Sequence, residues 1–141
     1  MEVNDKNVQN LLNRLRKKIN NLRPVMNEIG EILHDSIMEN FEQEGRPKWK
    51  ELSPVTLAIR RKYGWTGKIL NIHGASGLVG SINYRADKDS VRIGTAKKYA
   101  RALHFGVDER NLPARPFIEA KEHDITLIKL KITEYLMKEY K

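Results

Sequence analysis

The hydrophobic pattern of this chain changes period twice, and this change limits the folds that the chain can adopt. Up to Phe41, and again after residue 121, apolar residues recur every three or four positions, as on one face of a helix. Between these regions, apolar and polar residues alternate on either side of a polar turn at residues 87–89, which predicts a β-hairpin. The alternating residues are Ile82, Tyr84, Ala86, Val91 and Ile93. The sequence therefore predicts an α+β fold in which N-terminal and C-terminal helices pack on a small antiparallel β-sheet.

Proline and glycine mark the ends of the predicted helices. Pro24 interrupts the first helical pattern because its ring removes a backbone donor, so a helix within residues 1–24, which could project, precedes one from about Val25 to Phe41. Ser53-Pro54 predicts the start of a short basic helix that ends at Gly64. A glycine-rich loop then runs to residue 80, and residues 95–106 form a further capped segment. Its inward-facing residues are expected to be Tyr99, Ala102 and Leu103.

The length of 141 residues suits a single domain, residues 1–141, that is long enough to bury a core. Its last part, residues 121–141, is a predicted helix with apolar positions at Ile125, Ile128, Ile132 and either Tyr135 or Leu136. The chain has no cysteine, which excludes disulfides and thiolate metal sites. It also has no apolar run near the roughly 20 residues that cross a bilayer and no apolar signal core at its start, so we expect a cytoplasmic origin and no membrane association.

The charges of the chain are separated by sign along the sequence, within a formal net charge of +8. Residues 24–44 contain six acidic and no basic side chains, whereas residues 45–68 contain seven basic and one acidic. Five carboxylates of the second predicted helix recur every three or four residues and form one stripe, which we call the acidic stripe. Its members are Glu28, Glu31, Asp35, Glu39 and Glu42. The stripe is either a solvated helix face or an interface that meets a basic partner.

Basic residues alternate with aromatic ones in two stretches, residues 46–50 and 60–65. The second stretch contains Arg60, Arg61, Lys62, Tyr63 and Trp65. Such a pattern can bind nucleic acid, because cations hold phosphates while aromatic rings stack on bases. Alternatively, Trp49, Leu52 and Leu57 are core residues and the cations are solvated, which is the interpretation that we prefer.

Motifs of catalysis are incomplete in this sequence. Residues 74–78 resemble a nucleophile elbow, but Leu78 stands in place of its final glycine. Gly67-Lys68 lacks the earlier glycine of a phosphate-binding loop and is followed by Ile69. The four histidines are far apart, without helical ligand spacing. We therefore expect no enzyme, no cofactor and no metal; a cell-wall or nucleic-acid hydrolase, which would need a carboxylate pair facing a cleft, is the weaker hypothesis.

Short motifs follow one another in a fixed order, from Gly45-Arg46-Pro47-Lys48-Trp49 through Val91-Arg92-Ile93-Gly94-Thr95 to Pro113-Ala114-Arg115-Pro116-Phe117. This ordered set resembles the phage virion morphogenesis family, which includes the tail completion protein of Mu-like phages and prophages. The likeness covers about residue 25 to the C-terminus, with residues 25–120 as the family core. Its motif residues include Trp49, Gly77, Gly94, Tyr99, His104, Gly106, Pro113, Pro116 and Phe117. The final run, Tyr99-Ala100, then His104-Phe105-Gly106, then Pro113-Ala114-Arg115-Pro116-Phe117, is its most specific part.

The resemblance implies a structural role in finishing the tail or joining it to the head, and kinship with neck proteins that form rings around the DNA channel. It implies partners among phage head and tail proteins, assembly in the host cytoplasm, and a final place in the tail or neck of the virion. It also leaves room for passing contact with DNA. The runner-up is a basic nucleic-acid-binding protein, whose DNA binding would depend steeply on salt.

Three local expectations accompany this hypothesis. Gly77, Gly94 and Gly106 should lie where a positive φ or a close backbone approach is needed. Residues 113–117 should be extended along a sheet edge, with Phe117 as the apolar anchor. Arg115 should pair with a buried carboxylate or reach a neighbouring subunit.

We further hypothesise a ring built by head-to-tail contacts, each of which uses two different patches of the subunit. The acidic stripe is one candidate patch, and the basic segment of Arg60, Arg61 and Lys62 is the other.

Overall fold

The structure, a computed structural model, describes residues 6–138, so the outermost residues of the predicted first and last helices, 1–5 and 139–141, lie outside the described residues. Five α-helices are present in these residues: α1 (Lys6–Asn20), α2 (Arg23–Glu42), α3 (Pro54–Tyr63), α4 (Ala100–Phe105) and α5 (Glu122–Met137). The strands are β1 (Asn83–Ala86) and β2 (Val91–Gly94). Short 3-10 turns are η1 (Gly74–Ser76), η2 (Val79–Ser81) and η3 (Asp108–Arg110). The predicted α+β class is confirmed.

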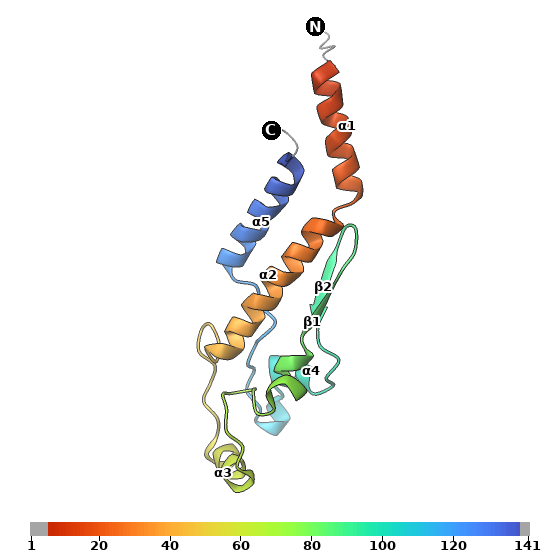
Figure 1. The fold of residues 1–141 in the computed structure, drawn as a ribbon. Helices are drawn as coiled ribbons and strands as arrows, with labels where there is room; N and C mark the ends of the chain where they lie inside the picture. Colours follow the sequence, from red (N-terminus) through yellow and green to blue (C-terminus); the bar gives the residue numbers. More distant parts are fainter. Residues whose placement is uncertain (1–5, 139–141) are drawn as a thin grey trace.

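Helix α2 lies between the sheet and α5, and it contacts both (Figure 1). The two strands pair antiparallel, with Asn83 opposite Gly94 and Ala86 opposite Val91, so the predicted hairpin is confirmed. Gly30 allows the hairpin to approach α2 closely, since a Cβ at this position would lie 2.2 Å from the Tyr84 ring. A longer side chain there would separate the helix from the sheet.

The predicted limits of the basic helix α3 are confirmed. The Ser53 hydroxyl accepts a hydrogen bond of 3.2 Å from the backbone N–H of Thr56, which satisfies one free donor of the first turn. Gly64 ends the helix in the left-handed conformation, with φ of 66°. At the other boundary, Pro24 lies in the first turn of α2, where a missing N–H is tolerated.

The core lies where the C-terminal half of α2 meets three segments that are distant in sequence. Phe41 packs against Trp49 with ring centroids 5.9 Å apart, and against Phe117 with centroids 5.2 Å apart. Both pairs are tilted or edge-on, the geometry that aromatic rings prefer. The other buried members of this cluster are Ile37, Ile69, Leu78, Ile82 and Ala100. The core role of Trp49 is confirmed, whereas that of Leu57 is wrong because its side chain is exposed.

Two further expectations about the core are wrong. Tyr99 is 46% exposed because it precedes the first turn of α4, where helical spacing does not apply, and Ala100 is buried instead. Ile125 is 45% exposed, since the neighbouring Asp124 takes the buried position on α5. A buried carboxylate in place of an apolar residue is contrary to the usual pattern of an amphipathic helix.

Phe117→Ala should destabilise the protein strongly, because it leaves a cavity against Phe41 and His104. The expected loss in the free energy of unfolding is about 3–5 kcal/mol, measured by urea denaturation. Phe105→Ala is the matched control, since Phe105 is 68% exposed whereas Phe117 is 1% exposed. Equal losses for the two variants would contradict the assignment of Phe117 to the core.

Candidate functional site

Residues 113–119 form an extended strap that crosses between α4 and α2. The backbone N–H of Arg115 donates to the Leu103 carbonyl at 3.0 Å, and that of Phe117 donates to Nδ1 of His104 at 3.3 Å. On the other side, Nε1 of Trp49 donates to the Pro116 carbonyl at 2.9 Å. The extended conformation and the anchoring role of Phe117 are confirmed. The predicted position at a sheet edge is wrong, because α4 and residues 49–51 provide the strap's partners.

The prediction that a positive φ or a close backbone approach requires glycine holds for Gly106 and Gly77 but not for Gly94. Gly106 has φ of 75°, and a Cβ there would lie 2.6 Å from the backbone nitrogen of Ala114, so this position requires glycine. Gly77 is buried, and a Cβ there would lie 3.0 Å from Cβ of His73, a close approach. The expectation is wrong for Gly94, because a Cβ there would meet nothing within 4 Å and its φ is not positive.

A buried polar network joins α2 to the strap and to α5. Nδ2 of Asn40 donates to the Phe117 carbonyl at 2.8 Å, and its Oδ1 accepts from Nε of Arg46 at 2.8 Å. Nη2 of Arg46 donates to the Ser36 hydroxyl, and that hydroxyl donates to Asp124. Asp124 also accepts from the backbone N–H of Lys121 at 2.8 Å. Sequence reasoning missed this network, although two polar residues inside the apolar pattern of α2, Ser36 and Asn40, were a signal for it.

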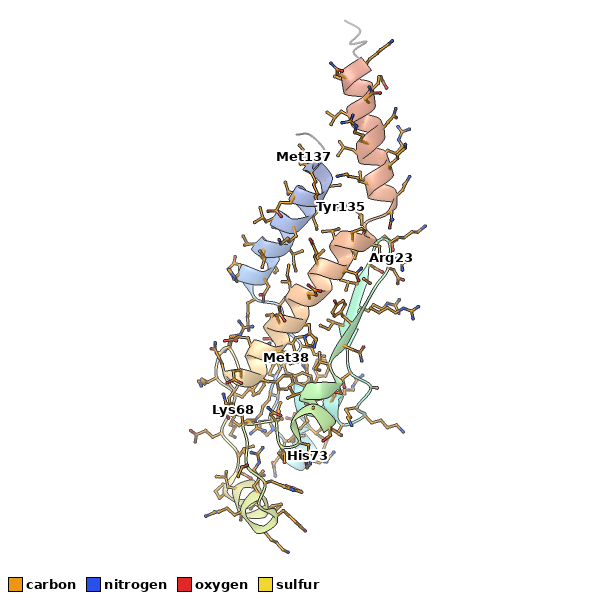
Figure 2. The ribbon with its side chains drawn as sticks, in the orientation of Figure 1. Arg23, Met38, Lys68, His73, Tyr135 and Met137 are labelled. Atoms are coloured by element: carbon orange, nitrogen blue, oxygen red, sulfur yellow. The ribbon has the colours of Figure 1, made fainter. Side chains whose placement is uncertain are left out.

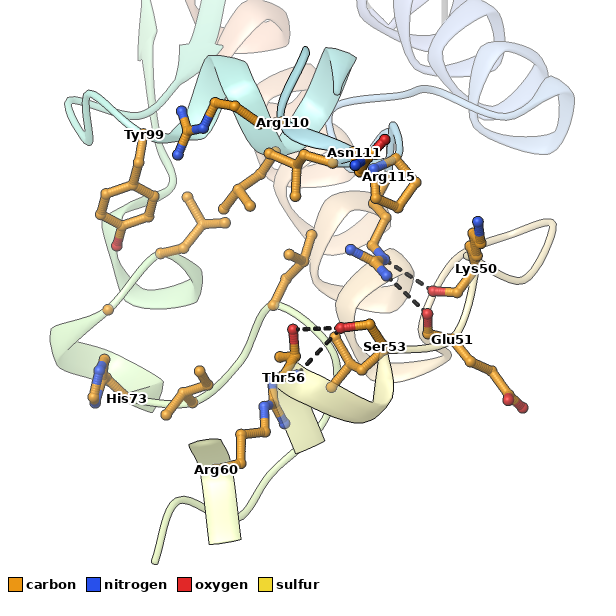
Figure 3. A pocket seen from close by; sticks show the side chains of 18 residues that line it. Lys50, Glu51, Ser53, Thr56, Arg60, His73, Tyr99, Arg110, Asn111 and Arg115 are labelled. Carbon is orange, nitrogen blue, oxygen red and sulfur yellow. Dashed lines mark hydrogen bonds between the residues drawn. The ribbon is translucent and has the colours of Figure 1, made fainter. Parts of the chain in front are cut away.

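A cavity of about 660 Å³ lies beside the strap, between it and α3 (Figure 3). Its walls come from residues 50–56, α3, the loop that contains η1, and the segment from Tyr99 to Arg115. Apolar side chains, including Leu52, Leu70 and Leu103, share the lining with basic ones. The size is within the range of roughly 300–1,000 Å³ that is usual for binding sites.

The basic side chains of this lining include two buried arginines. Nε and Nη2 of Arg115 donate to the carbonyls of Lys50 and Glu51, at 2.9 and 3.0 Å. Arg60 donates to the carbonyls of Gly67 and Lys68, at 3.0 and 3.3 Å. Burial lowers the pKa of Arg115, and the positive charge of Arg60 lowers this pKa further. In the described structure Arg115 thus bonds backbone carbonyls, so the expected pairing with a buried carboxylate is wrong, whereas contact with a neighbouring subunit stays a prediction.

The acidic stripe lies on the surface of α2. Glu28, Glu31, Asp35 and Glu42 are exposed and Glu39 is half-buried. Glu42 pairs with Lys68 at 2.6 Å, and Glu39 accepts a hydrogen bond from Gln43. These positions fit both interpretations of the stripe, so its role as an interface stays a prediction.

The basic segment of α3 divides into an interior and a surface part. Arg60 is buried, so it cannot belong to an exposed patch, whereas Arg61 and Lys62 are exposed. Beside them the Tyr63 and Trp65 rings stack with centroids 4.9 Å apart, and both are exposed. The candidate basic patch is therefore reduced to two cations next to an aromatic pair.

Neither a metal site nor a membrane span is found in the part of the chain that the structure describes. Residues 6–138 contain no group of three or more His, Asp or Glu residues that could hold a metal ion. No helix among the same residues is long and apolar enough to cross a membrane. Ser76, the serine of the incomplete nucleophile elbow, lies in η1 and donates to the His73 carbonyl, not to a histidine ring.

Comparison with known proteins decides the family. The sequence profile of the phage virion morphogenesis family matches residues 3–137. This chain belongs to that family. Two relatives come from Haemophilus influenzae, where they are the Mu-like prophage FluMu G proteins 1 and 2. The first is 30% identical over 110 residues, which are 76% of this chain and 74% of that protein. The second is 26% identical over 141 residues, which are 96% and 94% of the two chains.

An uncharacterised protein of Methanocaldococcus jannaschii is 29% identical over 106 residues, 74% of this chain and 78% of that protein. No solved structure matches the chain. The family confirms the resemblance and a role in phage virion morphogenesis.

Most of the family motif residues that we identified belong to the strap or lie next to it. Trp49, His104, Pro116 and Phe117 bond or pack together, and Gly106 lets the chain approach Ala114. Pro113 lines the cavity beside the strap. Trp49, His104, Pro116 and Phe117 therefore have a structural role in joining the strap to the core.

Asp124→Ala should weaken the attachment of α5, because it leaves the Ser36 hydroxyl and the Lys121 N–H without their partner. The expected cost is about 1–3 kcal/mol in the free energy of unfolding, the range for stranded buried polar groups. Glu122→Ala, an exposed carboxylate of the same turn, is the control and should change stability by less. Similar stability of both variants in thermal denaturation would contradict this role of Asp124.

Proposed function

We propose that this protein is a non-enzymatic structural component that completes the phage tail or joins it to the head, and that it works as an oligomeric ring. The observation that carries the proposal is the family match over residues 3–137. It is supported by relatives that belong to a Mu-like prophage. On this proposal the chain assembles in the host cytoplasm, contacts other head and tail proteins, and ends in the tail or neck of the virion.

Helix α1 supports assembly with other chains. It is 15 residues long and none of its residues is buried, so the rest of the chain leaves its apolar residues Val8, Leu12 and Ile19 exposed. Its attachment is at the base, where Nζ of Lys18 donates to the Tyr135 carbonyl and the Tyr135 hydroxyl donates to the Asn21 carbonyl, both at 2.6 Å. Figure 2 shows Tyr135 at this junction, with the side chains of α1 spread above it. A helix of this length is marginal in water unless an apolar face is packed, so a further partner would stabilise it.

The separation of charge supports contacts between copies. The acidic stripe of one subunit and the cations around α3 of the next are opposite in sign, as head-to-tail contacts within a ring require two complementary patches. The elongated arrangement of the helices places α1 and α3 at opposite ends of the described chain (Figure 1). Such separation lets one subunit contact two neighbours at once.

Nucleic-acid binding is the second candidate, and the exposed Tyr63–Trp65 pair favours it. Exposed rings next to Arg61 and Lys62 can stack on bases while the cations contact phosphates. In a ring around a DNA channel the same residues would make passing contact with DNA.

Interrupting the reading frame in its own phage or prophage should yield DNA-filled heads beside separate or malformed tails. Negative-stain electron microscopy would show these particles, and expression of the intact chain in trans should restore joined virions. Intact, infectious particles without the protein would overturn the proposed role. Binding of the purified chain to DNA, with affinity that falls steeply as salt rises, would then favour the second candidate.

Reversing the charge of the acidic stripe should impair assembly without unfolding the subunit. The variant carries Glu31→Lys, Asp35→Lys and Glu39→Lys, and the expected result is a loss of infectious particles of at least about tenfold, the effect of roughly 1.4 kcal/mol of lost contact energy. The control reverses three other carboxylates that are exposed, Asp89, Asp108 and Glu109. Normal assembly of the stripe variant, with an unchanged circular dichroism spectrum, would remove the electrostatic part of the proposal.

A further inference from the structure

The cavity beside the strap contains positive charge that no carboxylate of residues 6–138 neutralises. Arg60 and Arg115 are 7% and 5% exposed, and their hydrogen bonds go to backbone carbonyls. The three ion pairs of residues 6–138 all involve lysines. Nε of Arg60 is buried and has no partner within the described chain. Buried cations without a counter-ion are costly, so this site is incomplete in a single subunit.

The rest of the lining determines which kind of group would complete the site. Lys50 and Arg110 add two cations at exposed positions of the wall. Glu51 is the one carboxylate of the lining, and Figure 3 shows its side chain directed away from the cavity while its carbonyl accepts from Arg115. Apolar side chains such as Leu52, Leu70 and Leu112 cover the remaining wall. A carboxylate on an apolar stem matches both features, because arginine binds carboxylates through two parallel hydrogen bonds.

In the acidic stripe, carboxylates outnumber the basic residues that are near them in the sequence. The carboxylates of residues 45–138 each have a basic residue within three positions along the chain, such as Arg110 near Asp108 and Lys121 near Glu122. Residues 24–44 contain no basic residue at all. Glu31 and Asp35 are exposed on α2 and belong to none of the three ion pairs of the described residues. They are therefore available to a neighbouring subunit.

We propose that the cavity lined by Arg60, Arg110 and Arg115 receives carboxylates of the acidic stripe from a second copy of this chain. The inference rests on the proposed oligomer and specifies its basic side. The contact is then made with the cavity next to α3 instead of the exposed cations Arg61 and Lys62. Each subunit supplies the counter-ion that its neighbour lacks, so the site is complete only in the assembled ring.

A photo-crosslinking experiment tests this inference directly. Because the chain has no cysteine, Lys50→Cys introduces a single thiol at the cavity wall, to which a benzophenone maleimide is attached. Particles are assembled from an equal mixture of this variant and isotopically heavy wild-type chain, irradiated, digested and analysed by mass spectrometry. The expected product joins residue 50 to a heavy peptide from residues 24–44. The control carries the label at Asp89→Cys, in the hairpin turn, and should not give this product.

Arg110→Gln provides the second readout, because Arg110 is exposed and its replacement should leave the fold intact. The yield of the crosslink should fall severalfold in this variant and stay unchanged in the control Lys88→Gln. An unchanged yield in Arg110→Gln would overturn the electrostatic pairing.

The possible failures are distinguishable. Crosslinks from residue 50 to a different virion protein, or to another part of a second copy, would overturn this inference and leave the proposed function standing. Absence of the chain from the particles would overturn the proposed function, and the inference with it.

Discussion

The docking of the strap on α2 is the contact on which the rest of the structure depends. Asn40 of α2 holds the Phe117 carbonyl while Phe41 packs against the Phe117 ring, so one turn of helix provides both hydrogen bond and apolar contact. The same region holds Trp49 and, through Ser36 and Asp124, the start of α5. Because a buried amide or carboxylate is stable only when it is hydrogen-bonded, this network favours one arrangement of the three segments.

The strap also connects the core with the surface that we assign to assembly. Arg115 lies between Pro113 and Phe117 and holds the carbonyls of residues 50 and 51. The residues that stabilise the fold therefore also fix the wall of the cavity. The cavity lacks a counter-ion for its arginines, but the core around it is well packed. Such a subunit can stay folded by itself and still bind a neighbour that supplies the missing carboxylate.

Local sequence signals predicted the elements well where one residue decides the backbone. Ser53 and Gly64 limit α3, Pro24 separates the first two helices, and alternation around residues 87–89 produces the hairpin. The predictions about side-chain direction were less successful. Ile125 is exposed since Asp124 bonds Ser36 across 88 positions of sequence, and periodicity within one helix contains no information about that partner.

The sequence by itself determined the α+β class, the limits of the short basic helix and the separation of charge into acidic and basic blocks. These properties depend on neighbouring residues, through capping, φ preferences and composition. Only the tertiary structure decided that Arg60 and Arg115 share a cavity whose one lining carboxylate, that of Glu51, points away from it (Figure 3). It also decided that Arg60 is buried while Arg61 and Lys62 are exposed. Whether a cation is buried, and which group faces it, depends on segments that meet only when the chain is folded. The spacing of residues along the sequence does not show which distant segments will meet.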